Sequence, residues 1–115
     1  MKLTNEQMLE SLYILSRAEE TGKLGFACAR NRRKLTDEVK EYVEKRDEIL
    51  AKYGDPTGEN QFLISAENRD AFEKELGEYS GIECDVAVMT VDADTFCNGH
   101  FNSQEMFTLD WMVED

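Results

Sequence analysis

The sequence predicts an α+β fold in which an N-terminal antiparallel helical hairpin packs with a small antiparallel sheet and short C-terminal helices. Two observations support this prediction. Residues 1–53 carry apolar side chains at helical spacing, whereas residues 54–115 mix short apolar runs with turn residues. A chain of 115 residues that is 41% hydrophobic fits one domain over residues 1–115, with a helical hairpin at 1–53 and an acidic mixed half at 54–115.

The first helix is expected to begin at Thr4. The Thr4 hydroxyl and the Gln7 side chain, three residues later, form the pattern of a capping box. Met8, Leu12 and Leu15 then follow at helical spacing. The dipeptide after residue 20, Thr-Gly, is expected to end this helix, and the short connection favours an antiparallel second helix.

The second helix is expected over residues 23–53. An apolar stripe recurs every seven residues and predicts the face that packs on the first helix. Its members are Cys28, Leu35, Tyr42 and Ile49. Gly54 is expected to end this helix in the left-handed conformation, and residues 55–58 then read as a turn because they contain Asp, Pro and Gly.

The second half is expected to begin with a short strand at residues 61–64. Ser65 then caps a short helix that Gly77 ends. Residues 82–91 read as the best strand of the chain, because the apolar side chains of residues 82, 84, 86 and 88 share one face and the side chains of residues 83, 85, 87 and 89 share the other. Ser103 is expected to cap a last helix, whose aromatic and methionine side chains predict either core packing or a partner-binding surface.

Charge is distributed unevenly along the chain. The net charge is −12, which opposes direct binding to nucleic acid or to an anionic membrane. Residues 53–115 hold fifteen acidic and two basic side chains, whereas residues 23–52 hold nine basic and six acidic ones. This polarity leaves a solubilising surface, a basic protein partner or mimicry of a polyanion as explanations. The basic cluster at Arg30, Arg32, Arg33 and Lys34 reads either as a solvated face, with pairs such as Arg33–Asp37, or as an anion or partner site.

Few side chains are spaced for chemistry. Cys97 and His100, with Cys84, contain the donor atoms that zinc prefers, and Cys97 with His100 also matches a nucleophile and its base. The alternative is that the three side chains stay apart, with Cys84 a buried thiol, Cys97 a thiol in a loop and His100 an imidazole on the surface. Asp92 and Asp94 read either as ligands of a hard cation or as a solvated edge. Nothing in the sequence marks an oxyanion hole, so we expect a protein that is not an enzyme and holds no cofactor.

The chain is expected in the cytosol of a host cell. Three cysteines in no disulfide framework indicate free thiols in a reducing compartment. No run approaches the roughly 20 apolar residues of a membrane helix, and polar side chains interrupt the N-terminus where a signal peptide would be apolar.

The layout resembles a family of short, uncharacterised proteins that phages and prophages of Firmicutes encode. Four segments carry the resemblance: Lys2–Gln7, Gly25–Asn31, Ala51–Gly54 and Met106–Met112. The chain departs from the pattern at residues 98–100, where Asn-Gly-His precedes the last helix. Because that family has no known function, the resemblance implies only a phage or prophage origin and a binding role rather than an enzymatic one.

Three functional hypotheses follow. The first is an inhibitor that binds a host nucleic-acid-binding or CRISPR-type defence protein through an acidic face that mimics nucleic acid. The second is an accessory protein of virion or tail assembly, and the third is a metal-binding protein using Cys84, Cys97 and His100. The oligomeric state stays open. The carboxylates predicted to contact a basic partner are Glu73, Glu75, Glu78, Glu83, Asp85, Asp92 and Asp94.

Overall fold

A computed structural model describes residues 1–59 and 61–114, and it confirms the α+β class. Two antiparallel sheets of two strands each accompany the helices, and they pair β1 with β4 and β2 with β3. The strands are β1 (Lys2–Thr4), β2 (Gly54–Gly58), β3 (Gln61–Ile64) and β4 (Glu83–Asp85). The helices are α1 (Asn5–Leu15), α2 (Gly22–Tyr53), α3 (Ala66–Ser80), α4 (Ala93–Cys97), α5 (Ser103–Thr108) and the 3₁₀ helix η1 (Asp110–Met112).

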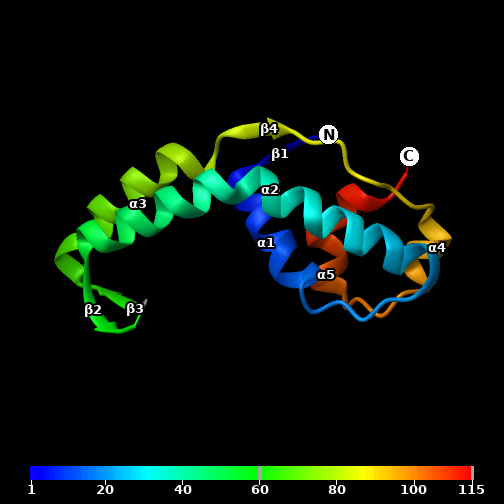
Figure 1. The fold of residues 1–115 in the computed structure, drawn as a ribbon, viewed down its shortest axis with the longest axis horizontal. Helices are drawn as coiled ribbons and strands as arrows, with labels where there is room; N and C mark the ends of the chain where they lie inside the picture. The colour runs from blue at the N-terminus through cyan, green and yellow to red at the C-terminus, as the bar shows by residue number, and fades with distance from the viewer. Residues whose placement is uncertain (60, 115) are drawn as a thin grey trace.

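The molecule is elongated along α2. It measures 48 × 27 × 23 Å, and its radius of gyration of 16.2 Å exceeds the value of about 13 Å for a compact domain of this length. Figure 1 shows α1 and α4 beside the first half of α2, α5 against α1, and α3 beside the second half of α2. We call the second half of α2 (residues 40–53), β2, β3 and α3 the arm, and the remainder the body.

The core lies mainly in the body. Its largest fully buried side chains include Met8, Leu35, Leu109 and Met112. In the arm, Tyr42 still belongs to the main cluster, Ile49 is 2% exposed but stands apart from it, and no residue of α3 is buried. The arm therefore rests on half-buried contacts along α2.

The predicted start of α1 is confirmed. The Gln7 N–H donates to Thr4 Oγ1 at 3.1 Å, and the Thr4 N–H donates to Gln7 Oε1 at 2.8 Å. This capping box satisfies two of the backbone donors that a helix start leaves unpaired. The second helix is also confirmed, beginning one residue earlier than expected, at Gly22.

The predicted end of α2 at Gly54 is confirmed, but the left-handed conformation expected of this glycine is wrong. Its φ of −100° is extended backbone rather than left-handed. A glycine is required for a different reason: a Cβ here would lie 2.7 Å from the Leu50 oxygen and 2.8 Å from the Phe62 Cβ. The turn predicted at residues 55–58 is likewise wrong, because Gly54–Gly58 forms β2 and pairs with β3. Pro56 is compatible with this strand because a two-stranded sheet leaves one edge of each strand free.

The predicted end of α3 at Gly77 is also wrong, since the helix continues to Ser80. Gly77 lies in open space within the helix, where an isolated glycine is tolerated at a cost of about 1 kcal/mol relative to alanine. Ser65 occupies the predicted cap position, and residues 61–64 form the predicted strand.

Only Glu83–Asp85 of the strand predicted at 82–91 pairs in a sheet. Its partner β1 is three residues long, because α1 begins at Asn5 and ends the strand. The chain beyond Asp85 finds other partners. The Asn31 side chain donates to the Met89 oxygen at 2.8 Å and accepts from the Met89 N–H at 2.7 Å.

The last helix is capped one residue before the predicted Ser103. Asn102 accepts from the Glu105 N–H at 2.9 Å, and the Glu105 side chain accepts from the Asn102 N–H at 3.0 Å. After this helix, Trp111 is buried and donates from its indole nitrogen to Ser11 Oγ at 3.0 Å. Leu109, Trp111 and Met112 of the C-terminal segment therefore belong to the core, whereas Phe107 is 79% exposed.

Replacing Asn31 with alanine tests the attachment of residues 86–91 to α2. The change leaves two backbone groups of Met89 without their partner, so the free energy of unfolding should fall by about 1–3 kcal/mol. Denaturant unfolding measures the loss. Asn98→Ala, at an exposed asparagine, is the control and should stay within about 0.5 kcal/mol of the wild type. Equal stability of the two variants would contradict the assignment.

Candidate functional site

The seven predicted carboxylates do not form one compact patch. Glu73, Glu75 and Glu78 lie on α3, Glu83 and Asp85 on β4, and the remaining two at α4. These elements follow one another along the molecule, from the arm, over the top edge in Figure 1, to the opposite end at α4. We call this course the acidic edge. Residues 66–94, which contain it, hold nine acidic and two basic side chains.

Three of the seven already have structural partners. Glu75 pairs with Lys52 at 2.8 Å, and Asp85 pairs with the N-terminal amine at 3.0 Å. Asp92 caps α4 by accepting from the Thr95 N–H at 2.7 Å, and this bond holds the pKa of Asp92 below its usual value. Each of these three carboxylates therefore already has a contact within the described structure.

Four carboxylates of the acidic edge remain free to contact a partner. They are exposed, and none forms an ion pair within residues 1–59 and 61–114. These four are Glu73, Glu78, Glu83 and Asp94. On α3 the half-buried side chains Phe72, Leu76 and Tyr79 face α2. Glu73 and Glu78 are five residues apart, so they lie on the two flanks of the outer side of this helix.

The potential metal ligands are not brought together. Cys84 lies beside Asn5, with its sulfur 3.9 Å from Asn5 Oδ1, whereas Cys97 is exposed at the end of α4. Across the described part of the chain, no three His, Cys, Asp or Glu side chains gather as a metal site would require. The geometry therefore gives no support to a site built from Cys84, Cys97 and His100.

His100 instead contacts Glu20. Glu20 accepts from the His100 N–H at 2.7 Å and lies 3.2 Å from its ring Nδ1. The Glu20 side chain is 5% exposed, whereas that of His100 is 82% exposed. The adjacent Gly99 packs closely, because a Cβ there would lie 2.5 Å from Leu24 Cδ2. This contact joins the α1–α2 connection to the α4–α5 connection, and no local sequence pattern indicates it.

The cationic side chains of α2 lie on its surface. Arg30, Arg32 and Arg33 are exposed, Lys34 is half-buried, and the expected Arg33–Asp37 ion pair is absent from the described residues. A shallow hollow of about 370 Å³ lies beside Arg32, Arg33 and Asp37. The cluster therefore stays available to an anionic group.

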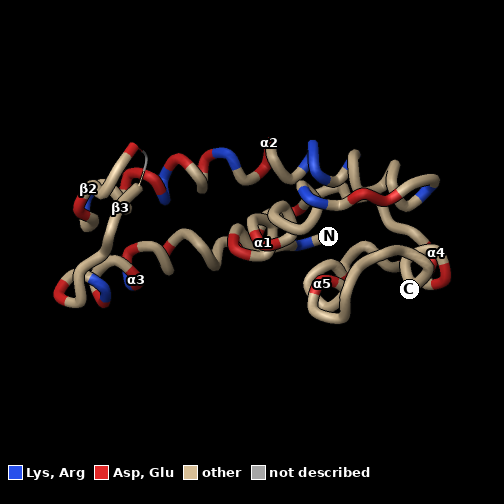
Figure 2. The backbone as a smooth tube through the Cα atoms, turned by 90° about the horizontal axis from the view of Figure 1, so that it is seen from below, with Lys and Arg blue, Asp and Glu red and all other residues tan. Residues whose placement is uncertain are grey.

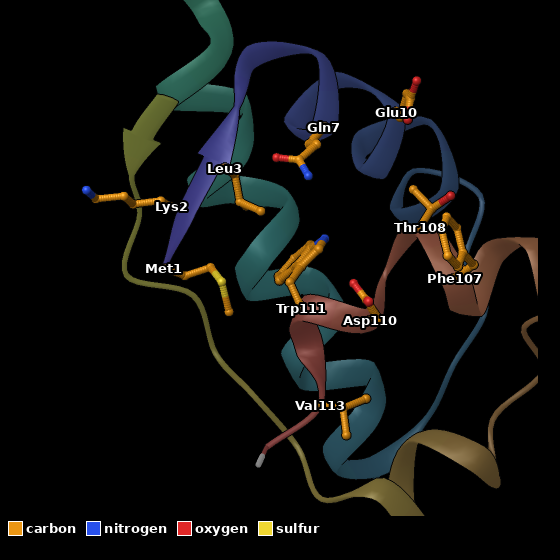
Figure 3. A pocket seen from close by; sticks show the side chains of 10 residues that line it. All are labelled: Met1, Lys2, Leu3, Gln7, Glu10, Phe107, Thr108, Asp110, Trp111 and Val113. Carbon is orange, nitrogen blue, oxygen red and sulfur yellow. The ribbon is translucent and has the colours of Figure 1, made fainter. Parts of the chain in front are cut away.

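A second hollow, of about 470 Å³, lies between β1 and the C-terminal segment. Figure 3 shows Leu3 and Trp111 on one side of it and Phe107 on the other, with β4 on the far side of β1. Glu10 and Asp110 also line this hollow. No local sequence pattern indicates this hollow, because its walls come from both ends of the chain.

No described helix combines the length and the apolarity needed to cross a membrane. No model of a known protein family, no curated protein and no solved structure matches the chain. The resemblance to phage and prophage proteins therefore stays a prediction, and the function has to be argued from the chain's own residues.

The Cys28 thiol provides a test of how the buried face of α2 packs, because this side chain is buried there. Burial, aided by the negative charge of Glu20, raises the pKa of Cys28 from 9.0 to about 11. The folded state then holds the thiol proton more tightly than the unfolded state, so stability declines as the pH rises from about 9 to about 11.

Denaturant unfolding across this pH range should show a smaller decline in the free energy of unfolding for Cys28→Ala than for the wild type. Cys97→Ala, at an exposed thiol, is the control and should keep the wild-type decline. Parallel curves for all three proteins would show that Cys28 is not buried as described.

Proposed function

We propose that the chain acts by protein–protein binding, as an inhibitor that places its acidic edge in the basic groove of a nucleic-acid-binding protein. The host proteins that fit best are those of CRISPR-type defence, because they hold nucleic acid in positively charged channels. The proposal assigns the chain no catalytic step and places it in the cytosol of the host cell.

The observation that carries the proposal is the set of four unpaired carboxylates, Glu73, Glu78, Glu83 and Asp94. A carboxylate without a cationic partner loses no intramolecular ion pair when it meets an arginine or a lysine of another protein. Because the carboxylates follow an edge of the molecule rather than a round patch, they match an elongated basic groove better than a small basic pocket.

The shape of the arm supports the same function. In Figure 2 the arm extends away from the body, with acidic positions on both of its helices. A two-helix projection can enter a channel that a compact domain of the same mass cannot. Charge complementarity of this kind accelerates association and weakens it at high salt, because the interacting charges are exposed.

A second candidate function is a role in virion or tail assembly, in which an apolar surface binds a structural protein. The specific observation that favours it is Phe107, which is 79% exposed at the rim of the hollow beside Trp111. An exposed aromatic side chain next to a hollow is typical of an anchor for a protein partner.

Affinity capture with matched baits tests the proposal. The test bait carries Glu73→Lys, Glu78→Lys, Glu83→Lys and Asp94→Lys. The control bait carries four charge reversals away from the acidic edge, with the same net charge. These are Glu19→Lys, Asp55→Lys, Glu59→Lys and Glu114→Lys, all at exposed positions.

The wild type and the control bait should capture the same basic nucleic-acid-binding protein from a bacterial lysate, identified by mass spectrometry, and the test bait should lose it. Added DNA or RNA should release the captured protein, because both ligands occupy one groove. Undiminished capture by the test bait would show that the acidic edge is not the surface that binds the partner. Capture that only Phe107→Ser abolishes, and that nucleic acid does not affect, would favour the assembly role.

A further inference from the structure

The outer face of α2 carries a continuous stripe of exposed residues. They follow one another at alternating spacings of four and three, so they share one side of the helix over about 38 Å. We call them the outer stripe: Phe26, Arg30, Arg33, Asp37, Lys40, Glu44, Asp47 and Ala51. All eight are exposed.

Among the residues that the structure describes, no other element covers this side of α2 along its middle. The buried side chains Cys28, Leu35, Tyr42 and Ile49 mark the opposite face, against which α1 and α3 pack. Figure 2 shows α1, α3 and α5 on one side of α2, while its outer side stays uncovered. The outer stripe is therefore accessible to a second molecule along its whole length.

The charges of the outer stripe are complementary to those of an inverted copy. If two α2 helices lie antiparallel and cross at the point between residues 38 and 39, Arg30 faces Asp47, Arg33 faces Glu44, and Asp37 faces Lys40. Every charged pair is of opposite sign, and each occurs twice. The two end positions, Phe26 and Ala51, also face each other, so the apolar residues of the stripe meet as well.

The spacing suits such a pairing. Alternating steps of four and three residues define the seam of a coiled coil, in which two helices stay in contact at a crossing angle of about 20°. In an antiparallel arrangement the first residue of one seam, Phe26, meets the last residue of the other, Ala51. The spacing is common to any face of a helix, but the opposite signs of the facing charges do not follow from the need to bury the opposite face of α2.

The single molecule leaves these charges largely unused. Among the described residues, Arg30, Arg33, Asp37, Lys40 and Glu44 form no ion pair. Asp47 has one long contact, at 3.9 Å, with Arg46. The hollow of about 370 Å³ beside Arg33 and Asp37 offers space for side chains of a partner helix near the middle of the seam.

We propose that two copies of this chain associate antiparallel along the outer stripes of α2, in a symmetric dimer whose twofold axis passes between residues 38 and 39. A second copy is the partner that fits, because it supplies every opposing charge at the correct position. The dimer is weak, because each molecule carries a net charge of −12 and the two copies repel each other. It dissociates at high salt, because the ion pairs that hold it are exposed.

This dimer does not depend on the proposed function. Since α3 packs on the opposite face of α2, the carboxylates of its outer side stay exposed in both copies. The dimer would present two acidic edges, and loss of the dimer would leave each edge intact.

Sedimentation equilibrium at ~0.05 M and ~0.5 M NaCl tests the dimer. The wild type should approach twice the monomer mass of 13.2 kDa at low salt and high protein concentration, and return to the monomer mass at high salt. Two reversed variants isolate the seam. One carries Arg30→Glu with Arg33→Glu, and the other carries Glu44→Lys with Asp47→Lys.

Each reversed variant alone should be monomeric, because four of its six charged pairs become like-charged. Their mixture should form a heterodimer, because all six pairs are then of opposite sign. The control, Arg69→Glu with Lys74→Glu, makes the net charge equally negative as the arginine variant but alters exposed residues of α3, so it should still dimerise. Circular dichroism checks that every variant is folded.

Three results would overturn the proposal. The first is a wild type that stays monomeric at low salt up to the highest soluble concentration. The second is a dimer that both reversed variants retain, because it would use another surface. The third is a mixture of the two folded variants that stays monomeric, because complementary charge would then not select the seam.

Discussion

The structure depends on the burial of one stripe along a single long helix. α2 has 32 residues, and its stripe from Leu24 to Ile49 needs apolar partners along almost its entire length. No neighbouring element is long enough to supply them alone. α1, the C-terminal segment and α4 cover the first half, and α3 covers the second. Because these elements come from distant parts of the sequence, α2 determines where each of them lies.

The two halves of α2 are held differently. In the body, fully buried side chains surround it, and Asn31 binds the backbone of Met89 through two hydrogen bonds. In the arm, the contacts are more peripheral: Lys52 pairs with Glu75, Lys45 lies over the Tyr79 ring, and Tyr42 and Ile49 are the buried side chains. Exposed pairs of this kind contribute little to stability. The arm is thus the part of the described structure that a partner can reshape most easily.

Local signals in the sequence predicted local structure well. The capping box at Thr4, the length of α2 and the strand at residues 61–64 depend on neighbours within a few residues. One local signal failed, since α3 continues past Gly77 to Ser80. Two other errors arise where the outcome depends on distant residues. Gly54 is needed for the approach of Phe62, and the strand predicted at 82–91 finds in β1 a partner of only three residues.

The same distinction applies to the candidate site. The acidity of the second half is visible in the composition, and it predicted the acidic edge. The sequence alone does not indicate which carboxylates already have an ion pair or a hydrogen bond. Their partners, which are Lys52, the N-terminal amine and Thr95, are brought to them only by the fold. Glu20 was missed for the same reason, since the His100 backbone that it binds is 80 residues away.

Hydrogen exchange measured amide by amide along α2 tests the central claim, that one helix is shared by a tightly packed body and a loosely packed arm. Amides of residues 27–39, in the tightly packed body, should exchange only through global unfolding. Amides of residues 45–53 should exchange faster, through an opening that they share with α3. Equal protection along the whole of α2 would contradict the account, because it would show that the arm is held as firmly as the body.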